Sequence, residues 1–228
     1  MSQRTLDQRM LGVGTALTDH TITATDVISF ADVGASNAIK RDTVQGVLDL
    51  AGGGGLVYIS TVTASDAASA NFTSGIDSTY DVYLVTLDNG VPAANSVLYA
   101  RISVGGSWRS TGGDYQWIST AATTSATTSV YAMGSSSDTE LHIQNSNTLQ
   151  WDTSGQGTFK FWMYNPSRTS TPRTFIWENN TVNNAVNTGI ANGAGSFKGV
   201  TTAIDGVQFF SSTGNLSGTF RLYGLAKS

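Results

Sequence analysis

Two histidines, His20 and His142, are the side chains of this sequence whose ordinary pKa lies near neutrality. A nucleophilic hydroxyl needs such a base beside it, and the base needs a third group to orient it. The sequence contains no G-x-S-x-G turn to present a serine. His142 shares one face of an expected strand with Glu140 and Gln144, while Leu141 and Ile143 lie on the other face, which indicates a solvated imidazole. We therefore predict no catalytic residue.

Paired carboxylates are the other route to chemistry, because glycosidases work with two of them. The chain has 16 acidic residues, and Asp114, Asp152 and Glu178 are conceivable members of a pair. Spacing along the sequence does not say which strands meet in space. A small glycan hydrolase is accordingly kept as the less favoured alternative to a protein that is not an enzyme.

Metal and cofactor motifs are absent from the sequence. It has no cysteine, no H-E-x-x-H and no EF-hand loop. A Ca²⁺ site lined by oxygen atoms remains open, because such a site cannot be predicted from residue spacing. The glycines of Gly193–Lys198 have the wrong spacing for a phosphate loop, and we interpret this segment as a turn. We expect no metal and no cofactor.

The charge balance argues against nucleic acid as a partner. Twelve Lys and Arg stand against 16 Asp and Glu, the formal net charge is −4, and no cluster of basic residues occurs. Affinity for phosphate backbones rests on such clusters.

Aromatic residues beside polar turns are the remaining candidates for binding. A ring can stack on the face of a sugar while neighbouring amides bind its hydroxyl groups. The alternative for each ring is packing in a β core, which buries most tryptophans. The predicted glycan-binding set is Trp108, Tyr115, Trp117, Trp151, Trp177, Glu178 and Asn179.

Short alternating runs separated by turn residues predict the elements that position these side chains. Charged residues make up only 12% of the chain, and turn signals such as Asp88-Asn89-Gly90 recur at the spacing of an all-β protein. We predict an antiparallel β-sandwich, jelly-roll-like, over residues 56–228. Its expected strands are 56–63, 80–87, 97–104, 115–119, 129–133, 140–144, 158–164, 173–178, 206–211 and 218–225.

The first 51 residues have a different pattern and are predicted to form an extended anchoring arm. One strand is expected at 21–30, and one short helix near 43–51, capped by Asp42 or Thr43. Its apolar stripe must pack on the head or on another chain, because so short a helix is unstable alone. Gly52–Gly55 would then be a hinge, with an ordinary loop as the alternative. The predicted anchoring residues are Val44, Val47, Leu48 and Leu50.

Neither end of the sequence suggests a membrane. Met1–Met10 is polar and lacks the apolar segment of a secretory signal, and no run approaches 18 apolar residues. We expect no membrane insertion, and release from the producing cell by lysis.

Two segments carry a resemblance to a known group. Ile28–Leu50 (ISFADVGASNAIKRDTVQGVLDL) resembles the leader of structural proteins of tailed bacteriophages, where it precedes a glycine-rich joint and a β head. Ser217–Leu225 (SGTFRLYGL) is similar to the last strand of those heads. Tyr80–Pro92 and Ala203–Leu225 are similar to the same group, so the resemblance covers most of the chain.

The resemblance implies a virion appendage of the fibre type. Its arm would be fixed to a capsid, neck or tail protein, and its head would project, most often as a homotrimer, and recognise a host-surface polysaccharide. A capsid decoration, cement or head-fibre protein is the alternative. The shared motifs are structural, so no active-site residue is implied.

Overall fold

The computed structural model describes residues 27–32, 38–43, 55–124, 130–144, 151–153, 155–182, 188–199 and 202–226. The chain divides into two units, Met1–Gly53 with Ser228, and Gly54–Lys227, and each is described by itself.

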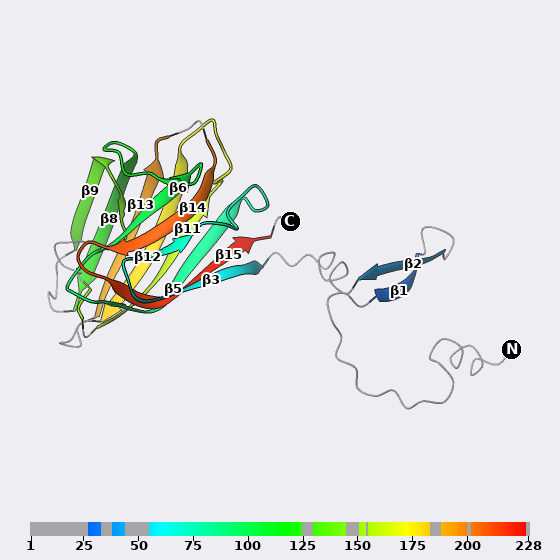
Figure 1. Ribbon diagram of the computed structural model, residues 1–228, viewed down its shortest axis with the longest axis horizontal. Coiled ribbons are helices and arrows are strands. Elements are labelled where there is room, and N and C mark those ends of the chain that lie inside the picture. The colour runs from blue at the N-terminus through cyan, green and yellow to red at the C-terminus, as the bar shows by residue number, and fades with distance from the viewer. Residues whose placement is uncertain are drawn as a thin grey trace, which may run out of the picture. The chain divides into compact units, whose positions relative to one another are not determined.

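The first unit contains an antiparallel pair of strands, β1 (Val27–Asp32) and β2 (Ala38–Thr43), whose register joins Val27 to Thr43 and Asp32 to Ala38 (Figure 1). The strand expected at 21–30 overlaps β1. Asp42, a predicted helix cap, lies inside β2 instead, paired with Ile28. The rest of the predicted helix, with Val44, Val47, Leu48 and Leu50, lies outside the described residues, as do Gly52–Gly54 of the expected hinge.

The second unit is built from strands throughout its described residues. They are β3 (Leu56–Ala67), β4 (Ser69–Phe72), β5 (Val82–Pro92), β6 (Leu98–Val104), β7 (Ser107–Trp108), β8 (Tyr115–Thr123), β9 (Tyr131–Asp138), β10 (Leu141–His142), β11 (Gln156–Tyr164), β12 (Arg173–Val182), β13 (Thr188–Phe197), β14 (Ile204–Ser211) and β15 (Leu216–Leu225).

These strands form a large and a small sheet. The large sheet has eight strands in the order β3-β15-β5-β11-β12-β13-β8-β9. The small one has the order β10-β6-β14-β4, with β7 paired to β6. Neighbouring strands in both sheets are antiparallel, so the prediction of an antiparallel all-β fold is confirmed. Jelly-roll connectivity stays a prediction.

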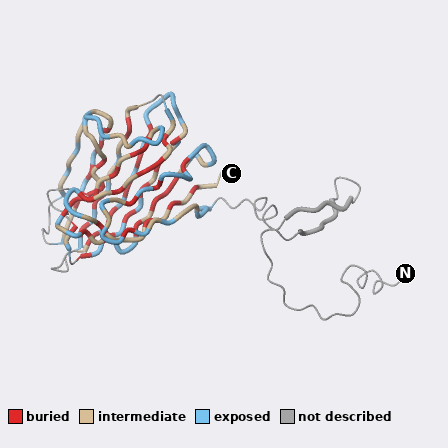
Figure 2. The backbone as a smooth tube through the Cα atoms, viewed as in Figure 1, coloured by how far each residue is buried: buried red, intermediate tan, exposed pale blue. Residues whose placement is uncertain are grey.

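One hydrophobic core joins the two sheets, and Figure 2 shows the buried backbone positions that run through both. Phe209 of β14 is at its centre, with ring centroids 4.9 Å from Phe159, 5.5 Å from Phe161 and 5.6 Å from Phe220 on the large sheet. Strands β8, β11 and β12 of the large sheet alternate accordingly. In β12, Phe175 and Trp177 are buried while Ile176 and Glu178 are exposed. The large sheet therefore has a core face and an outer face.

The segment interpreted as a turn at Gly193–Lys198 is instead mostly strand. Thr188–Phe197 forms β13, which pairs with β12 along its whole length and with β8 on its other side. A Cβ on Gly193 would come 2.4 Å from the indole of Trp177, so glycine serves here to admit a large neighbouring ring. Packing of two flanking strands outweighs the weak strand preference of this glycine-rich sequence.

Candidate functional site

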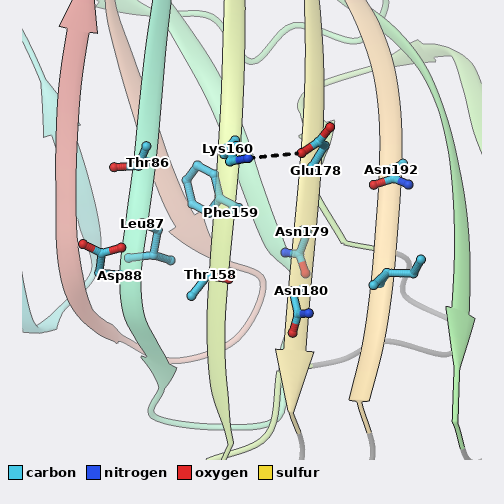
Figure 3. Close-up of a pocket in the computed structure, with 11 residues that line it drawn as sticks. Thr86, Leu87, Asp88, Thr158, Phe159, Lys160, Glu178, Asn179, Asn180 and Asn192 are labelled. Atoms are coloured by element: carbon cyan, nitrogen blue, oxygen red, sulfur yellow. Dashed lines mark ion pairs between the residues drawn. The ribbon is translucent and has the colours of Figure 1, made fainter. Parts of the chain in front are cut away.

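A cavity of about 500 Å³ with both polar and apolar lining lies on the outer face of the large sheet, over β5, β11, β12 and β13 (Figure 3). Strand register brings its residues together. Lys160 stands opposite Thr86 on one side and Glu178 on the other, and Glu178 stands opposite Asn192. The lining comprises Thr86, Leu87, Asp88, Thr158, Phe159, Lys160, Glu178, Asn179, Asn180, Ile190 and Asn192.

Charges in and beside the cavity are paired within the sheet. Nζ of Lys160 lies 3.7 Å from Oε2 of Glu178, and Asp88 forms an ion pair with Arg221 of β15. The Lys160 and Glu178 side chains are each about three-fifths exposed, so solvent screens their attraction. The cavity consequently presents both signs of charge with little net charge, and its ammonium and carboxylate groups remain open to a ligand.

Two exposed asparagines, Asn180 and Asn192, add amide donors and acceptors to the cavity. Asn179 also belongs to the lining, but it is only 3% exposed and alternates with Glu178 and Asn180, which places its side chain on the core face of β12. Neither its Oδ1 nor its Nδ2 has a hydrogen-bond partner among the described residues. The amides open to a ligand on the outer face are therefore those of Asn180 and Asn192.

Among the predicted glycan-binding residues, Glu178 and Asn179 line the cavity, and the aromatic ones do not. Trp151 and Trp177 are buried in the core, packed against glycines of neighbouring strands. Tyr115 is also buried, and its hydroxyl accepts from the backbone N–H of Ile102 and donates to the carbonyl of Arg109.

The other two aromatic residues predicted to bind a glycan are Trp117 and Trp108. Trp117 is 6% exposed and its indole N–H donates to Asp138 at 2.9 Å, while Trp108 is half-buried in the short strand β7. A sugar cannot reach the ring faces of four of the predicted residues, because these rings are buried in the hydrophobic core: Tyr115, Trp117, Trp151 and Trp177.

A row of apolar residues crosses the large sheet beside the cavity, two residues away from the cavity residues on each strand that lines it; Leu84 in this row is buried, and the others are partly or fully exposed. Register aligns them in one row across seven strands, from β3 to β8: Tyr58, Tyr223, Leu84, Trp162, Ile176, Ala194 and Ile118. Tyr58, Ile176 and Ile118 are between 46% and 61% exposed. We call this set the outer apolar row. Its aromatic members include Tyr58 and Tyr223, whose rings meet edge to face with centroids 5.9 Å apart.

Sequence reasoning missed Thr86, Lys160 and Asn192 as cavity residues. Alternation in 158–164 already placed Lys160 opposite to the buried Phe159 and Phe161, which was the available signal. Asn192 gave none, because its segment was interpreted as a turn.

His142 is not the solvated residue that its neighbours suggested. Its imidazole is stacked 4.3 Å from the ring of Trp117 and 4.4 Å from that of Tyr99, and its side chain is 16% exposed. Burial lowers the pKa of His142, against the opposing influence of Asp138 and Glu140. The imidazole is mostly neutral at pH 7 in consequence.

Of the three carboxylates considered as catalytic partners, only Glu178 lines the cavity. Asp114 is bound instead by Arg109 at 3.3 Å and by the backbone N–H of Thr111 at 3.0 Å. The second carboxylate of the cavity lining is Asp88.

Within the described part of the chain, no helix is long and apolar enough to cross a membrane.

Comparison with protein-family models and with curated proteins finds no match. Among solved structures, the chain is similar to a crystal structure of the enzymatically active domain of tailspike protein 2 of bacteriophage CBA120. The sequences are 14% identical, the TM-score is 0.28, and the match covers 76% of this chain and 28% of that chain. A similarity of this size assigns neither a fold nor a function.

Proposed function

We propose that this protein is a virion appendage of a tailed bacteriophage, of the fibre type, whose β head binds a host-surface glycan in the cavity on the outer face of the large sheet. The observation that carries the binding part is the convergence of Lys160, Glu178 and Asn192 from three adjacent strands around one cavity. The phage assignment rests on the sequence resemblance of Ile28–Leu50 and Ser217–Leu225.

The composition of the cavity suits an uncharged sugar. Sugar hydroxyl groups both donate and accept hydrogen bonds, and the lining offers partners of both kinds: amides, threonine hydroxyls, an ammonium and carboxylates. The outer apolar row beside it can take the C–H face of a neighbouring ring. Phosphate or another strong anion suits it less, because Lys160 and Arg221 each already have a carboxylate partner.

Binding is tested by competition. Purified protein is added to host cells before the phage, and the concentration that halves adsorption is measured for wild type, Asn192→Ala and Lys160→Ala. Loss of a hydrogen bond to a bound sugar should weaken competition by roughly 2- to 150-fold, since each bond is worth about 0.5–3 kcal/mol. Gln208→Ala is the control, because that side chain bonds to Asn71 in the small sheet, outside the cavity lining.

Three results would contradict the proposal. Equal competition by the cavity variants and wild type would move recognition elsewhere. New reducing ends in host polysaccharide incubated with the protein, lost in Glu178→Gln, would make it a hydrolase. Particles trimmed at the glycine run that lose heat resistance but still adsorb would show a cementing role for the head.

The arm is proposed to anchor the protein, and a homotrimer is the proposed assembly. Leu48→Asp should leave the head folded and abolish incorporation into particles, because a charge would interrupt the predicted apolar stripe. Immunoblots of purified particles measure incorporation. Normal incorporation would exclude this stripe as the anchor.

A further inference from the structure

The chain passes from the large sheet to the small one through residues 138–142, and this corner gathers three metal-ligating side chains. Asp138 is the last residue of β9, His142 belongs to β10, and Glu140 lies between them. One ligand atom from each lies within 4.8 Å of the others. None is more than 22% exposed, so the cluster is partly shielded from solvent.

Both carboxylates are oriented by neighbouring strands. The indole N–H of Trp117 on β8 donates to Oδ2 of Asp138 at 2.9 Å. Arg101 on β6 donates to Oε2 of Glu140 at 2.9 Å, and the Thr139 hydroxyl donates to the same oxygen. Hydrogen bonds of this kind fix ligand carboxylates in metal sites and account for much of their affinity.

The imidazole of His142 is the unsatisfied member of the group. Trp117 and Tyr99 hold its plane, as described above, yet its buried Nδ1 has no hydrogen-bond partner among the described residues. Its Nε2 lies 3.6 Å from Oδ2 of Asp138, beyond hydrogen-bond distance. An imidazole nitrogen that makes no hydrogen bond and lies beside a carboxylate can offer its lone pair to a cation, because metal ions bind the neutral form of the ring.

We propose that Asp138, Glu140 and His142 form a binding site for a divalent transition-metal ion, with Zn²⁺ as the best fit, which ties β9 of the large sheet to β10 of the small sheet. One imidazole nitrogen and two carboxylate oxygens suit zinc, whereas Ca²⁺ and Mg²⁺ prefer oxygen alone. Two tetrahedral ligands of zinc lie about 3.4 Å apart at the usual bond lengths. Nε2 of His142 and Oδ2 of Asp138, 3.6 Å apart, are already near that separation, and the Glu140 carboxylate, within 4.8 Å of both residues' ligand atoms, would move toward them when the ion binds. Water fills the fourth position.

Zinc binding to the full chain is measured first. The protein is stripped with EDTA, exchanged into chelator-free buffer and titrated with ZnCl₂ by calorimetry. We expect one saturable site per chain and a rise in melting temperature with added zinc. In ¹⁵N spectra, the imidazole resonances of His142 should shift while those of His20 stay unchanged, a comparison that needs no variant.

Two isosteric variants, Asp138→Asn and Glu140→Gln, should each weaken zinc binding at least tenfold. His20→Ala removes the other histidine of the chain and is the matched control, which should bind as wild type. Circular dichroism establishes that each variant is folded. Absence of calorimetric binding at 100 µM ZnCl₂, a chemical-shift change at His20 instead of His142, or equal affinity in folded Asp138→Asn and wild type would each overturn the proposal.

Discussion

At the scale of single residues, the tryptophans and glycines of the head work in pairs. An added Cβ would meet the indole of Trp151 at 2.3 Å from Gly157, and that of Trp177 at 2.4 Å from Gly193. Asn, Asp, Gln and Ser near these rings in the sequence suggested polar turns with exposed aromatic residues. In the fold, glycines of neighbouring strands make room for the rings instead. The sequence could not show this arrangement, because Gly193 is distant from Trp177 along the chain and meets it only through strand pairing.

Gly193→Ala should therefore destabilise the head by about 1–3 kcal/mol, the usual cost of overpacking a core. Urea unfolding followed by tryptophan fluorescence measures the change. Gly112→Ala is the control, because a Cβ there meets nothing within 4 Å, and it should change the free energy of unfolding by less than about 0.5 kcal/mol. Equal effects at the two positions would show that the contact with Trp177 is relieved at little cost.

A second prediction concerns Arg173, which is 1% exposed. Its guanidinium donates to the carbonyls of Arg168 at 3.1 Å and Thr202 at 3.0 Å and lies 4.9 Å from the ring centroid of Phe197. Burial lowers the pKa of Arg173, yet the group stays charged at neutral pH.

Arg173→Met keeps the length of the side chain and leaves both carbonyls without this donor, so it should cost about 2–4 kcal/mol. Arg221→Met breaks the exposed pair with Asp88 and should cost at most about 1 kcal/mol. Melting temperatures of the two variants, measured side by side, give the comparison. A smaller loss for Arg173→Met than for Arg221→Met would contradict the assigned role.

At the scale of elements, strands rich in β-branched and aromatic residues were predictable, and strands without them were not. Residues 80–87 are apolar on both faces and 158–164 are rich in aromatic residues, and they became β5 and β11. Strand β13 consists largely of Gly, Ala and Asn, and its conformation is imposed by β12 and β8. The cavity was unpredictable for a related reason. Its side chains meet through the register of four strands, which depends on long-range pairing.

Face-to-face packing of the two sheets makes a prediction for β14. Phe209 faces the large sheet and should cost about 3–5 kcal/mol when replaced by alanine. Its neighbour Phe210 faces away, 5.6 Å from the ring of Tyr99 and 4.4 Å below the guanidinium of Arg101, and is only partly buried. Phe210→Ala should lose less than half as much stability in chemical denaturation. The reverse order would mean that the small sheet packs through its other face.

At the scale of the whole molecule, residues from Gly55 onward contain a complete core. The backbone N–H of Ala226 donates to the carbonyl of Gly55 at 3.2 Å, which extends the pairing of β15 with β3 beyond the Leu225–Leu56 pair. A fragment of residues 55–228 should melt within about 2 °C of the full chain, because the clustered core residues all lie within it. Differential scanning calorimetry of both proteins tests this, and a fragment that fails to fold would show that the first unit is needed for stability.

The position of β15 also dictates when the head can fold. This last strand lies between β3, the first strand of the head, and β5, and it pairs with both. Until its residues leave the ribosome, β3 lacks its neighbour in the large sheet and β5 keeps one unpaired edge. Such late, long-range pairing slows folding and leaves strand edges exposed meanwhile. The head therefore cannot complete its large sheet until β15 has been synthesised, and a product that stops just short of β15 should be trapped as an aggregating intermediate.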